Sequence, residues 1–378
     1  MANRYWVGGS ASWDATAGSK WALTSAGSGG EAVPTSSDDV FLDSGSGVVT
    51  VTVGNSYDAL FKSLNCTGFT GTLTCGTGSP NMLAGTSSTL GDFTLGSGMT
   101  FAGTWGSLVV SASSGTMQIT TNGIDLGTLG IGTSGGGSIT LLSDLTITAG
   151  SLTHNNAGTV NTNGFAVNIL TFVSSGSAAR TLTLGASTVT LTSTGSVWNY
   201  SGSNLTVTAN TSTIVISNTS ASSKTFVGGG ITTYNNLTIT GGGAGTIDIT
   251  GANTFNTFTI NPPKTVRFTA ATTTTFSSFV ATGTVGNVIT ILSITAATHT
   301  LSDASGTNSC DYLDLTNSVA EGGAGWYAGA NSDDNGGNTG WLFVAPTAIK
   351  TINGLAKASV KTVNGLAIAS AKTWNGLA

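Results

Sequence analysis

The stretch TLTLGASTVTL, residues 181–191, decides the fold of this chain. Leucine and valine occupy alternate positions on each side of a Gly-Ala-Ser turn, and threonine lies between them. Apolar residues with a period of two are typical of β-strands that bury one face. Threonine suits the other face, because its β-branched side chain fits the pleated sheet and its hydroxyl group can face water. The stretch therefore predicts two short strands joined by a tight turn.

The same pattern recurs along most of the chain. Further short strands are expected at residues 48–53, 145–148, 205–207 and 214–216. Similar units begin near Leu182, Leu205, Leu237 and Phe258. The steps between these units, roughly 20–30 residues each, fit single coils of a parallel β-helix with turns of variable length. A string of antiparallel β-sandwich modules would also place a strand roughly every 8–12 residues, but no boundary interrupts the pattern, which favours the β-helix.

The composition supports an all-β chain. Only 7% of the 378 residues are charged, against roughly 25% in a typical soluble protein, and 55 are glycine. Coiled coils and helical bundles are excluded because they need Glu, Lys, Leu and Ala. Collagen is excluded because the glycines keep no triplet period, and disorder is disfavoured because 39% of residues are hydrophobic. We therefore predict an all-β parallel β-helix, or solenoid, with an N-terminal aromatic cap and C-terminal β-hairpin repeats.

Residues 1–45 form the first of four predicted regions. They contain Trp6, Trp13 and Trp21, and we expect these indoles to be buried, either over the first coil or at an interface used in assembly. An end coil needs a cap, because it would otherwise expose its apolar interior and unpaired backbone. The other predicted regions are a β-helix body at 46–300, a closing segment at 301–345, and assembly or attachment repeats at 346–378.

The closing segment brings carboxylates back into the sequence. Asp333, Asp334 and Asn335 lie in an oxygen-rich stretch that could bind calcium, although it lacks the terminal bidentate glutamate of an EF-hand. A tight turn held by Asx side chains is the alternative. Trp326 and Tyr327 lie nearby; they could stack on a glycan, or they could close the solenoid. No other cofactor is expected.

An 11-residue repeat ends the chain. It reads KTINGLAKASV at 350–360, KTVNGLAIASA at 361–371 and KTWNGLA at 372–378. Asn-Gly is the strongest signal for a two-residue hairpin turn, because both residues tolerate positive φ, so each unit predicts a strand, a turn and a return strand. Such units are too small to bury a core of their own. Their apolar residues are therefore predicted to serve assembly or attachment: Ile352, Leu355, Val363, Leu366, Trp374 and Leu377.

The sequence offers little support for catalysis. A polysaccharide hydrolase usually needs two carboxylates about 5–10 Å apart, and Asp248 is the only acidic residue between residues 145 and 302. Asp92, Asp125 and Asp144 could meet across stacked coils, but solvated turn residues are the simpler interpretation. We therefore expect a protein that is not an enzyme.

The histidines, the cysteines and the net charge exclude further classes. His154 and His299 lie far apart among Thr and Asn, so we expect surface or turn positions and no metal role. Cys66, Cys75 and Cys310 are too few for a disulfide scaffold, and two buried thiols at Cys66 and Cys75 are favoured over a bond between them. A net charge of -5 argues against nucleic acid as a partner, and no apolar run is long enough to span a membrane.

Both ends of the chain resemble a known group of proteins. RYWVGG at residues 4–9 and VPTS at 33–36 are similar to the N-termini of glycine-rich tail and virion-appendage proteins of bacteriophages. Three later stretches are similar to the closing segments of the same proteins: CDYL at 310–313, GWYAGANS at 325–332 and NTGW at 338–341. The C-terminal repeats look like the tails of phage structural proteins. The resemblance implies a place in the virion and a homotrimer, and it transfers no catalytic residue.

These observations predict a non-enzymatic structural protein of a phage particle, such as a tail fibre, spike or surface appendage. Its expected partners are further copies of itself, other virion proteins and a host-surface glycan. The opening MANRYWVGGS lacks the apolar core of a signal peptide, so we expect synthesis in the cytoplasm of the host bacterium. A tailspike enzyme that degrades host polysaccharide is one alternative. A bacterial surface adhesin is another, and the missing signal peptide disfavours it.

Overall fold

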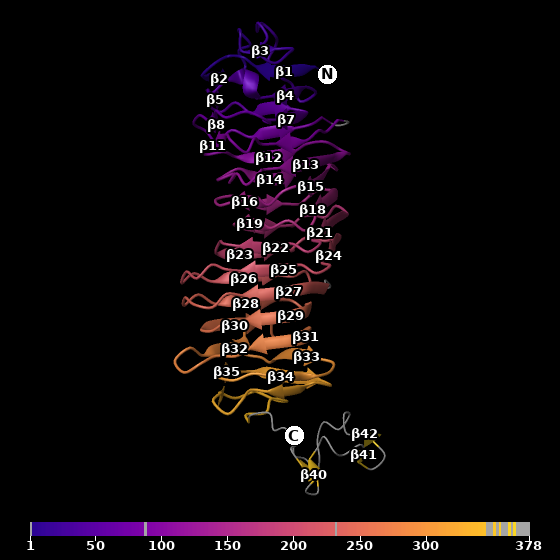
Figure 1. The fold of residues 1–378 in the computed structure, drawn as a ribbon. Coiled ribbons are helices and arrows are strands. Elements are labelled where there is room, and N and C mark those ends of the chain that lie inside the picture. Colours follow the sequence, from indigo (N-terminus) through magenta and orange to yellow (C-terminus); the bar gives the residue numbers. More distant parts are fainter. Residues whose placement is uncertain are drawn as a thin grey trace.

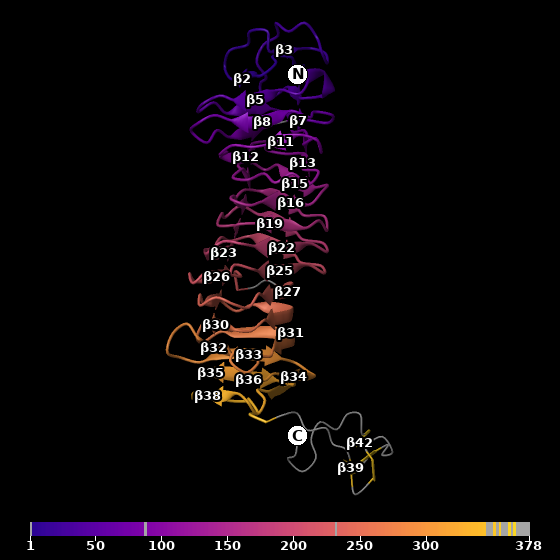
Figure 2. The same ribbon diagram turned by 60° about the vertical axis from the view of Figure 1, so that its left-hand side comes forward.

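The chain folds as a parallel β-solenoid of about 13 turns, with 45% of residues in strands and 1% in helix (Figure 1). This confirms the predicted fold class. The computed structural model describes residues 2–86, 89–230 and 233–344, and the backbone of four two-residue strands between residues 351 and 367. The N-terminus lies at one end of the stack of coils, and the coil that contains β38 lies at the other (Figure 2).

Most coils of the first half contribute one strand to each of three faces of the solenoid. The first face is the ten-stranded sheet A, whose spatial order is β3 (Trp21–Ala22), β1 (Asn3–Trp6), β4 (Asp39–Phe41), β7 (Ser63–Asn65), β10 (Phe93–Thr94), β13 (Thr116–Thr120), β15 (Ser138–Leu141), β18 (Gly158–Asn161), β21 (Arg180–Thr183) and β24 (Leu205–Thr208).

The second face consists of the four-stranded sheet B and then the nine-stranded sheet D. In the coils that have a strand on both of these faces, the strand of sheet B or sheet D follows the strand of sheet A in the sequence. Sheet B contains β2 (Ala11–Trp13), β5 (Thr50–Val53), β8 (Thr72–Cys75) and β11 (Thr100–Phe101). Sheet D contains β16 (Leu145–Ile147), β19 (Val167–Ile169), β22 (Thr188–Leu191), β25 (Thr213–Ile216), β27 (Thr233–Ile239), β29 (Thr254–Ile260), β31 (Thr273–Ala281), β33 (His299–Asp303) and β36 (Ser318–Gly322).

The third face is the 13-stranded sheet C, which runs through nearly the whole stack (Figure 2). Its strands are β6 (Ala59–Phe61), β9 (Met82–Ala84), β12 (Ser107–Val110), β14 (Gly130–Thr133), β17 (Leu152–Thr153), β20 (Phe172–Val173), β23 (Gly195–Asn199), β26 (Lys224–Val227), β28 (Ile247–Thr250), β30 (Lys264–Phe268), β32 (Ile289–Ser293), β35 (Leu313–Leu315) and β38 (Asp333–Asp334). A small sheet of β34 (Thr307–Ser309) and β37 (Gly325–Tyr327) joins the last coils, and a short 3-10 helix, η1 (Ser44–Ser46), follows β4.

The register of the sheets corrects one of the predicted steps. Leu237 pairs with Phe258 on sheet D, so the predicted step between these two residues is one coil. Leu182 and Leu205 both lie on sheet A, where Leu205 pairs with Arg180. The longest predicted step, from Leu205 to Leu237, instead joins two different faces. Strands on two faces have the same alternating pattern, so the sequence could not separate them.

The cross-section changes after β24, where sheet A ends. The strands of sheet D then become longer: β27 and β29 have seven residues each and β31 has nine. An unbroken row of aromatic rings begins in the core at β20, before sheet A ends, and continues to the last coil. Each ring contacts the next in the order Phe172, Trp198, Phe226, Phe255, Phe276, Phe279, Trp326 and Trp341.

Aspartate and asparagine side chains join the turns of adjacent coils. The carboxylate of Asp144 accepts the backbone N–H of Ala166 in the next coil at 2.9 Å. Asn122 and Asn163 adopt the left-handed conformation, with φ of 53° and 54°, which asparagine tolerates better than most residues. Their amide groups donate to backbone carbonyls of the preceding coil. These carboxylate and amide side chains therefore form hydrogen bonds with backbone N–H and C=O groups near the turns, which strand pairing leaves without a partner.

The C-terminal repeats contain the predicted hairpins in their first two units. β39 (Thr351–Ile352) pairs antiparallel with β40 (Leu355–Ala356), and β41 (Thr362–Val363) pairs antiparallel with β42 (Leu366–Ala367). Trp374 and Leu377 of the third unit lie outside the described residues, as do the side chains of all six predicted assembly residues.

Candidate functional site

The three N-terminal tryptophans lie in the core of the first coil. Trp6, Trp13 and Trp21 are fully buried, and the Trp21 ring meets the other two edge to face, with centroids 5.0 and 5.2 Å apart. The expected burial is confirmed. The surrounding segment is part of the solenoid, because β1 and β4 pair in sheet A and β2 pairs with β5, while the antiparallel β3 ends sheet A. A role for these residues in assembly stays a prediction.

Trp326 and Tyr327 do not form an exposed glycan platform. Their side chains are only 2% and 9% exposed. Trp326 packs edge to face on Trp341 at the end of the aromatic row, with ring centroids 5.1 Å apart, and its indole N–H donates to the Glu321 carbonyl at 2.9 Å. The prediction of stacking at this pair is therefore wrong, because β37 turns the rings into the core of the last coils, where they close the solenoid.

The acidic stretch predicted to bind calcium forms β38 and the turn after it. Asp333, Asp334 and Asn335 are exposed. The Asp334 carboxylate accepts the Gly336 backbone N–H at 3.0 Å and the Asn338 side-chain amide at 2.6 Å, which is the Asx-type turn considered as the alternative. The described residues contain no group of three or more His, Cys, Asp or Glu that could hold a metal ion. Calcium binding stays a prediction.

The aspartates considered as catalytic candidates serve as links between coils. Asp92, Asp125 and Asp144 each accept a backbone N–H from the following coil, with distances between 2.9 and 3.2 Å, the donors being Gln118, Thr148 and Ala166. Their carboxylates hold the turns of consecutive coils together. No contact between any two of the three is present among the described residues.

The histidines are core residues, which corrects the expectation of surface or turn positions. His154 and His299 are fully buried, because inward-facing positions on sheets C and D alternate with outward ones. Burial lowers the pKa of each to about 4, so both rings are neutral at pH 7. The Nδ1 atom of His299 lies 2.8 Å from the Ser293 hydroxyl, and its ring stacks on Phe268.

The sequence did not predict that three basic side chains would be buried. Arg180, Lys224 and Lys264 are nearly inaccessible, and burial lowers the pKa of each. The Lys224 ammonium donates to the Ser220 carbonyl at 2.6 Å, and the Lys264 ammonium donates to the Gly242 carbonyl at 2.9 Å. The two lysines stabilise turns that precede strands of sheet C, where their ammonium groups donate to backbone carbonyl groups.

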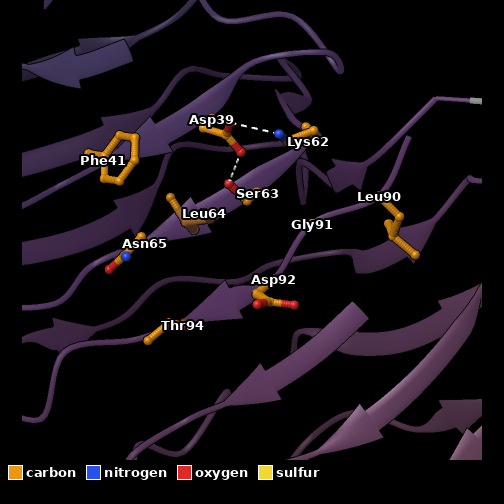
Figure 3. Close-up of a pocket in the computed structure, with 10 residues that line it drawn as sticks. All are labelled: Asp39, Phe41, Lys62, Ser63, Leu64, Asn65, Leu90, Gly91, Asp92 and Thr94. Atoms are coloured by element: carbon orange, nitrogen blue, oxygen red, sulfur yellow. Dashed lines mark hydrogen bonds and ion pairs between the residues drawn. The ribbon is translucent and has the colours of Figure 1, made fainter. Parts of the chain in front are cut away.

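A hollow on the outer face of sheet A gathers polar groups beside an aromatic ring (Figure 3). It has a volume of about 280 Å³ and is lined by the residues drawn in the figure, which belong to β4, β7, β10 and the turns before them. Asp39, Ser63 and Asp92 lie along one row across the strands, and Phe41, Asn65 and Thr94 lie along the next row. We call this site the sheet A hollow.

The charges in the sheet A hollow are arranged asymmetrically. The Lys62 ammonium lies 2.7 Å from Oδ2 of Asp39, and the Ser63 hydroxyl donates to Oδ1 of the same carboxylate. Asp92 is exposed, and its Oδ1 accepts the Gln118 backbone N–H at 3.1 Å. The hollow thus presents one ion-paired carboxylate and one solvent-facing carboxylate, an arrangement that can accept hydrogen bonds from a neutral hydroxylated ligand.

The sequence shows the three strand segments that line this hollow, but it does not show that they are neighbours. The triplets Asp39-Val40-Phe41, Ser63-Leu64-Asn65 and Asp92-Phe93-Thr94 share an outward-inward-outward pattern. Their outer residues come together only because the three strands pair in this register. The coil between the first two triplets is shorter than the coil between the last two, and no period in the sequence fixes either length.

Comparisons with protein-family models, with curated proteins and with solved structures found no match. Among the described residues, no helix has the length and apolar character needed to cross a membrane. The three cysteines are free thiols: Cys66 and Cys310 are buried and Cys75 is half-buried. The expected burial is therefore confirmed for Cys66 and is only partial for Cys75.

Proposed function

We propose that this chain is a non-enzymatic structural protein of a bacteriophage particle, a tail fibre, spike or surface appendage that contacts host-surface glycans. The unbroken stack of coils, which runs from β1 past β35 in Figure 1 and ends at β38, is the observation that supports it most. About 13 turns at a strand spacing of about 4.8 Å correspond to a rod roughly 60 Å long. Such a rod holds its two ends at a fixed separation, which an appendage requires.

The surface of the rod agrees with this role. Its outward positions hold mainly Thr, Ser and Asn, and the four ion pairs among the described residues join charges on the surface of the same chain. The two ends differ, because the antiparallel strand β3 ends sheet A at the first coil, while the C-terminal hairpins follow the last coil in the sequence. Different ends allow one end to attach to a particle and the other to be presented outward.

The proposed partners are further copies of the chain and other virion proteins. Hairpins with two residues per strand, such as β39–β40 and β41–β42, are too short to be stable alone in water. Packing against the same hairpins of other copies would stabilise them, which favours a homotrimer within the virion. We propose no nucleic-acid or membrane partner.

Purified particles of the phage that encodes the chain provide the test. Mass spectrometry of gradient-purified particles should detect the chain in a fixed ratio to the major capsid protein, and gold-labelled antibodies against the solenoid should decorate an external structure. Detection only in the lysate, with none in particles after the gradient, would overturn the proposal.

Polysaccharide cleavage is the second candidate, and the sheet A hollow is the observation that favours it. Asp39 and Asp92 lie two strand spacings apart in one row, which is about 10 Å and close to the upper end of the carboxylate separation in inverting glycosidases. Both oxygens of Asp39 are already bound, to Lys62 and Ser63, which favours binding over catalysis. New reducing ends from host polysaccharide, absent with Asp92→Asn, would establish cleavage instead.

A further inference from the structure

We propose that the sheet A hollow binds a neutral glycan chain that crosses β4, β7 and β10 along the axis of the solenoid. This inference rests on the proposed function, because it assigns a place to the expected contact with host-surface glycans. The argument depends on three features of the hollow: an aromatic ring with one covered face, a carboxylate with an unused oxygen, and the sign of the local charge. Figure 3 shows the ring of Phe41, the carboxylate of Asp92 and the ion pair of Asp39 with Lys62.

The aromatic feature is Phe41, which lines the hollow. Tyr5, its neighbour on β1, covers one face of the ring, with centroids 4.5 Å apart and planes within 12°. This stack fixes the orientation of the Phe41 ring. A pyranose ring presents a face of C–H groups, which packs well on an aromatic face and requires no change in the position of Phe41.

The carboxylate is Asp92, which is exposed at the far side of the hollow. Its Oδ1 is held by the Gln118 backbone N–H at 3.1 Å, and its Oδ2 has no hydrogen-bond partner among the described residues. An ionised carboxylate accepts hydrogen bonds and donates none, and its bonds to hydroxyl groups are stronger than neutral ones. A sugar hydroxyl group supplies the donor that Oδ2 lacks.

The spacing of these two residues sets the minimum size of the ligand. Phe41 and Asp92 are separated by two strand spacings and by one step of two residues along a strand, a diagonal of about 12 Å. One sugar ring is too short to contact both side chains, so the ligand contains at least two linked sugars. Ser63 and Asn65 lie between them on β7 and line the floor of the hollow.

The charge of the hollow selects against acidic glycans. Lys62 lies 2.7 Å from Asp39, which leaves the negative charge of Asp92 without a cation of its own in the lining of the hollow. A glycan that carries carboxylate or phosphate groups would be repelled by Asp92 at short range. Neutral glycans are therefore the chemical class that the hollow favours.

The test uses the full chain and a microarray of neutral and acidic bacterial-surface oligosaccharides, with polysialic acid and hyaluronan as additional acidic probes. The neutral oligosaccharide that gives the strongest signal is then titrated by isothermal calorimetry. Phe41→Ala and Asp92→Asn should each weaken binding by about tenfold. Thr183→Ala, an outward position on the same sheet in β21, is the matched control and should stay within about twofold.

Two results would overturn the inference: no neutral glycan bound, or binding that both hollow variants leave unchanged. If Phe41→Ala fails to fold, Asp92→Asn decides alone, because it keeps the shape of the side chain and can still accept the Gln118 N–H. The analysis of purified phage particles tests the proposed function and can fail independently of the glycan-binding experiment. A chain that is missing from particles but binds neutral glycan through Phe41 and Asp92 rejects the proposed function and keeps this site, whereas a chain found in particles without such binding rejects the site alone.

Discussion

The buried indoles of the first coil give the sharpest quantitative prediction. Trp6 and Trp13 are both fully buried and both pack edge to face on Trp21. They differ in one respect: the Trp6 N–H donates to the Gly9 carbonyl at 2.9 Å, whereas the Trp13 N–H is buried without a partner among the described residues. Replacement by phenylalanine removes a useful donor at one position and an unsatisfied donor at the other.

The expected free energies follow from this difference. Trp13→Ala leaves a large cavity and should destabilise the first coil by about 3–5 kcal/mol. A hydrogen bond contributes about 1 kcal/mol, and a buried donor without a partner costs about 1–3 kcal/mol. Trp13→Phe should therefore be less destabilising than Trp6→Phe by about 2–4 kcal/mol, because the two effects add. Val48→Ala, at a side chain that is 82% exposed, is the control and should have little effect.

Hydrogen exchange measured by mass spectrometry is the suitable assay, because each coil contacts only its neighbours and a loss of stability stays local. Peptides from residues 2–45 should exchange faster in Trp13→Ala, while peptides from residues 180–216 should not change. Equal exchange of the first coil in Trp6→Phe and Trp13→Phe would refute the hydrogen-bond argument. An unchanged first coil in Trp13→Ala would refute the packing argument as well.

Three further predictions concern pH, thiols and assembly. His154 and His299 have a pKa near 6.5 in the unfolded chain and of about 4 in the folded chain, so the unfolded chain binds more protons between these values. Urea unfolding should therefore show full stability above pH 6.5 and a loss of about 3 kcal/mol per histidine at pH 4. A free energy of unfolding that does not change over this pH range would contradict the prediction. A thiol reagent should modify half-buried Cys75 before buried Cys66, whereas equal rates would show that the core opens. Light scattering should give a mass near three times 37.4 kDa, reduced to one chain by deletion of residues 347–378, and an unchanged oligomer would show that the repeats are dispensable.

The sequence predicted local features correctly where the cause is local. Alternating Thr and Leu gave strands, Asn-Gly pairs gave the hairpins at 351–356 and 362–367, and Trp6 was expected inside. Strand propensity, turn conformation and the burial of a large apolar ring depend mainly on the residue and its near neighbours. Those predictions therefore needed no knowledge of how the coils stack.

The sequence was less informative about whether a given side chain points into the core or to the surface. Trp326 is in the core, where it closes the solenoid, which is one of the two roles that the sequence had left open for it. His299 is also buried, because it opens β33 at an inward position, where its Nδ1 atom lies 2.8 Å from the Ser293 hydroxyl. Side chains alternate between the core and the surface along each strand, so a shift of one residue exchanges the two faces. Strands as short as these contain too few residues to show which positions face inward.

The sequence by itself determined that this chain is all-β and built of short strands, because its period of two, its many turn residues and its shortage of charge exclude the helical and collagenous classes. Only the tertiary structure decided which strands are neighbours, and thereby brought Asp39, Ser63 and Asp92 into one row on sheet A. The physical reason is that parallel pairing is set by the length of each coil, which is short where Leu301 pairs with Ala320 and much longer where Leu64 pairs with Phe93. That length depends on how each turn packs on the turn of the adjacent coil, and no residue pattern within a single strand records it.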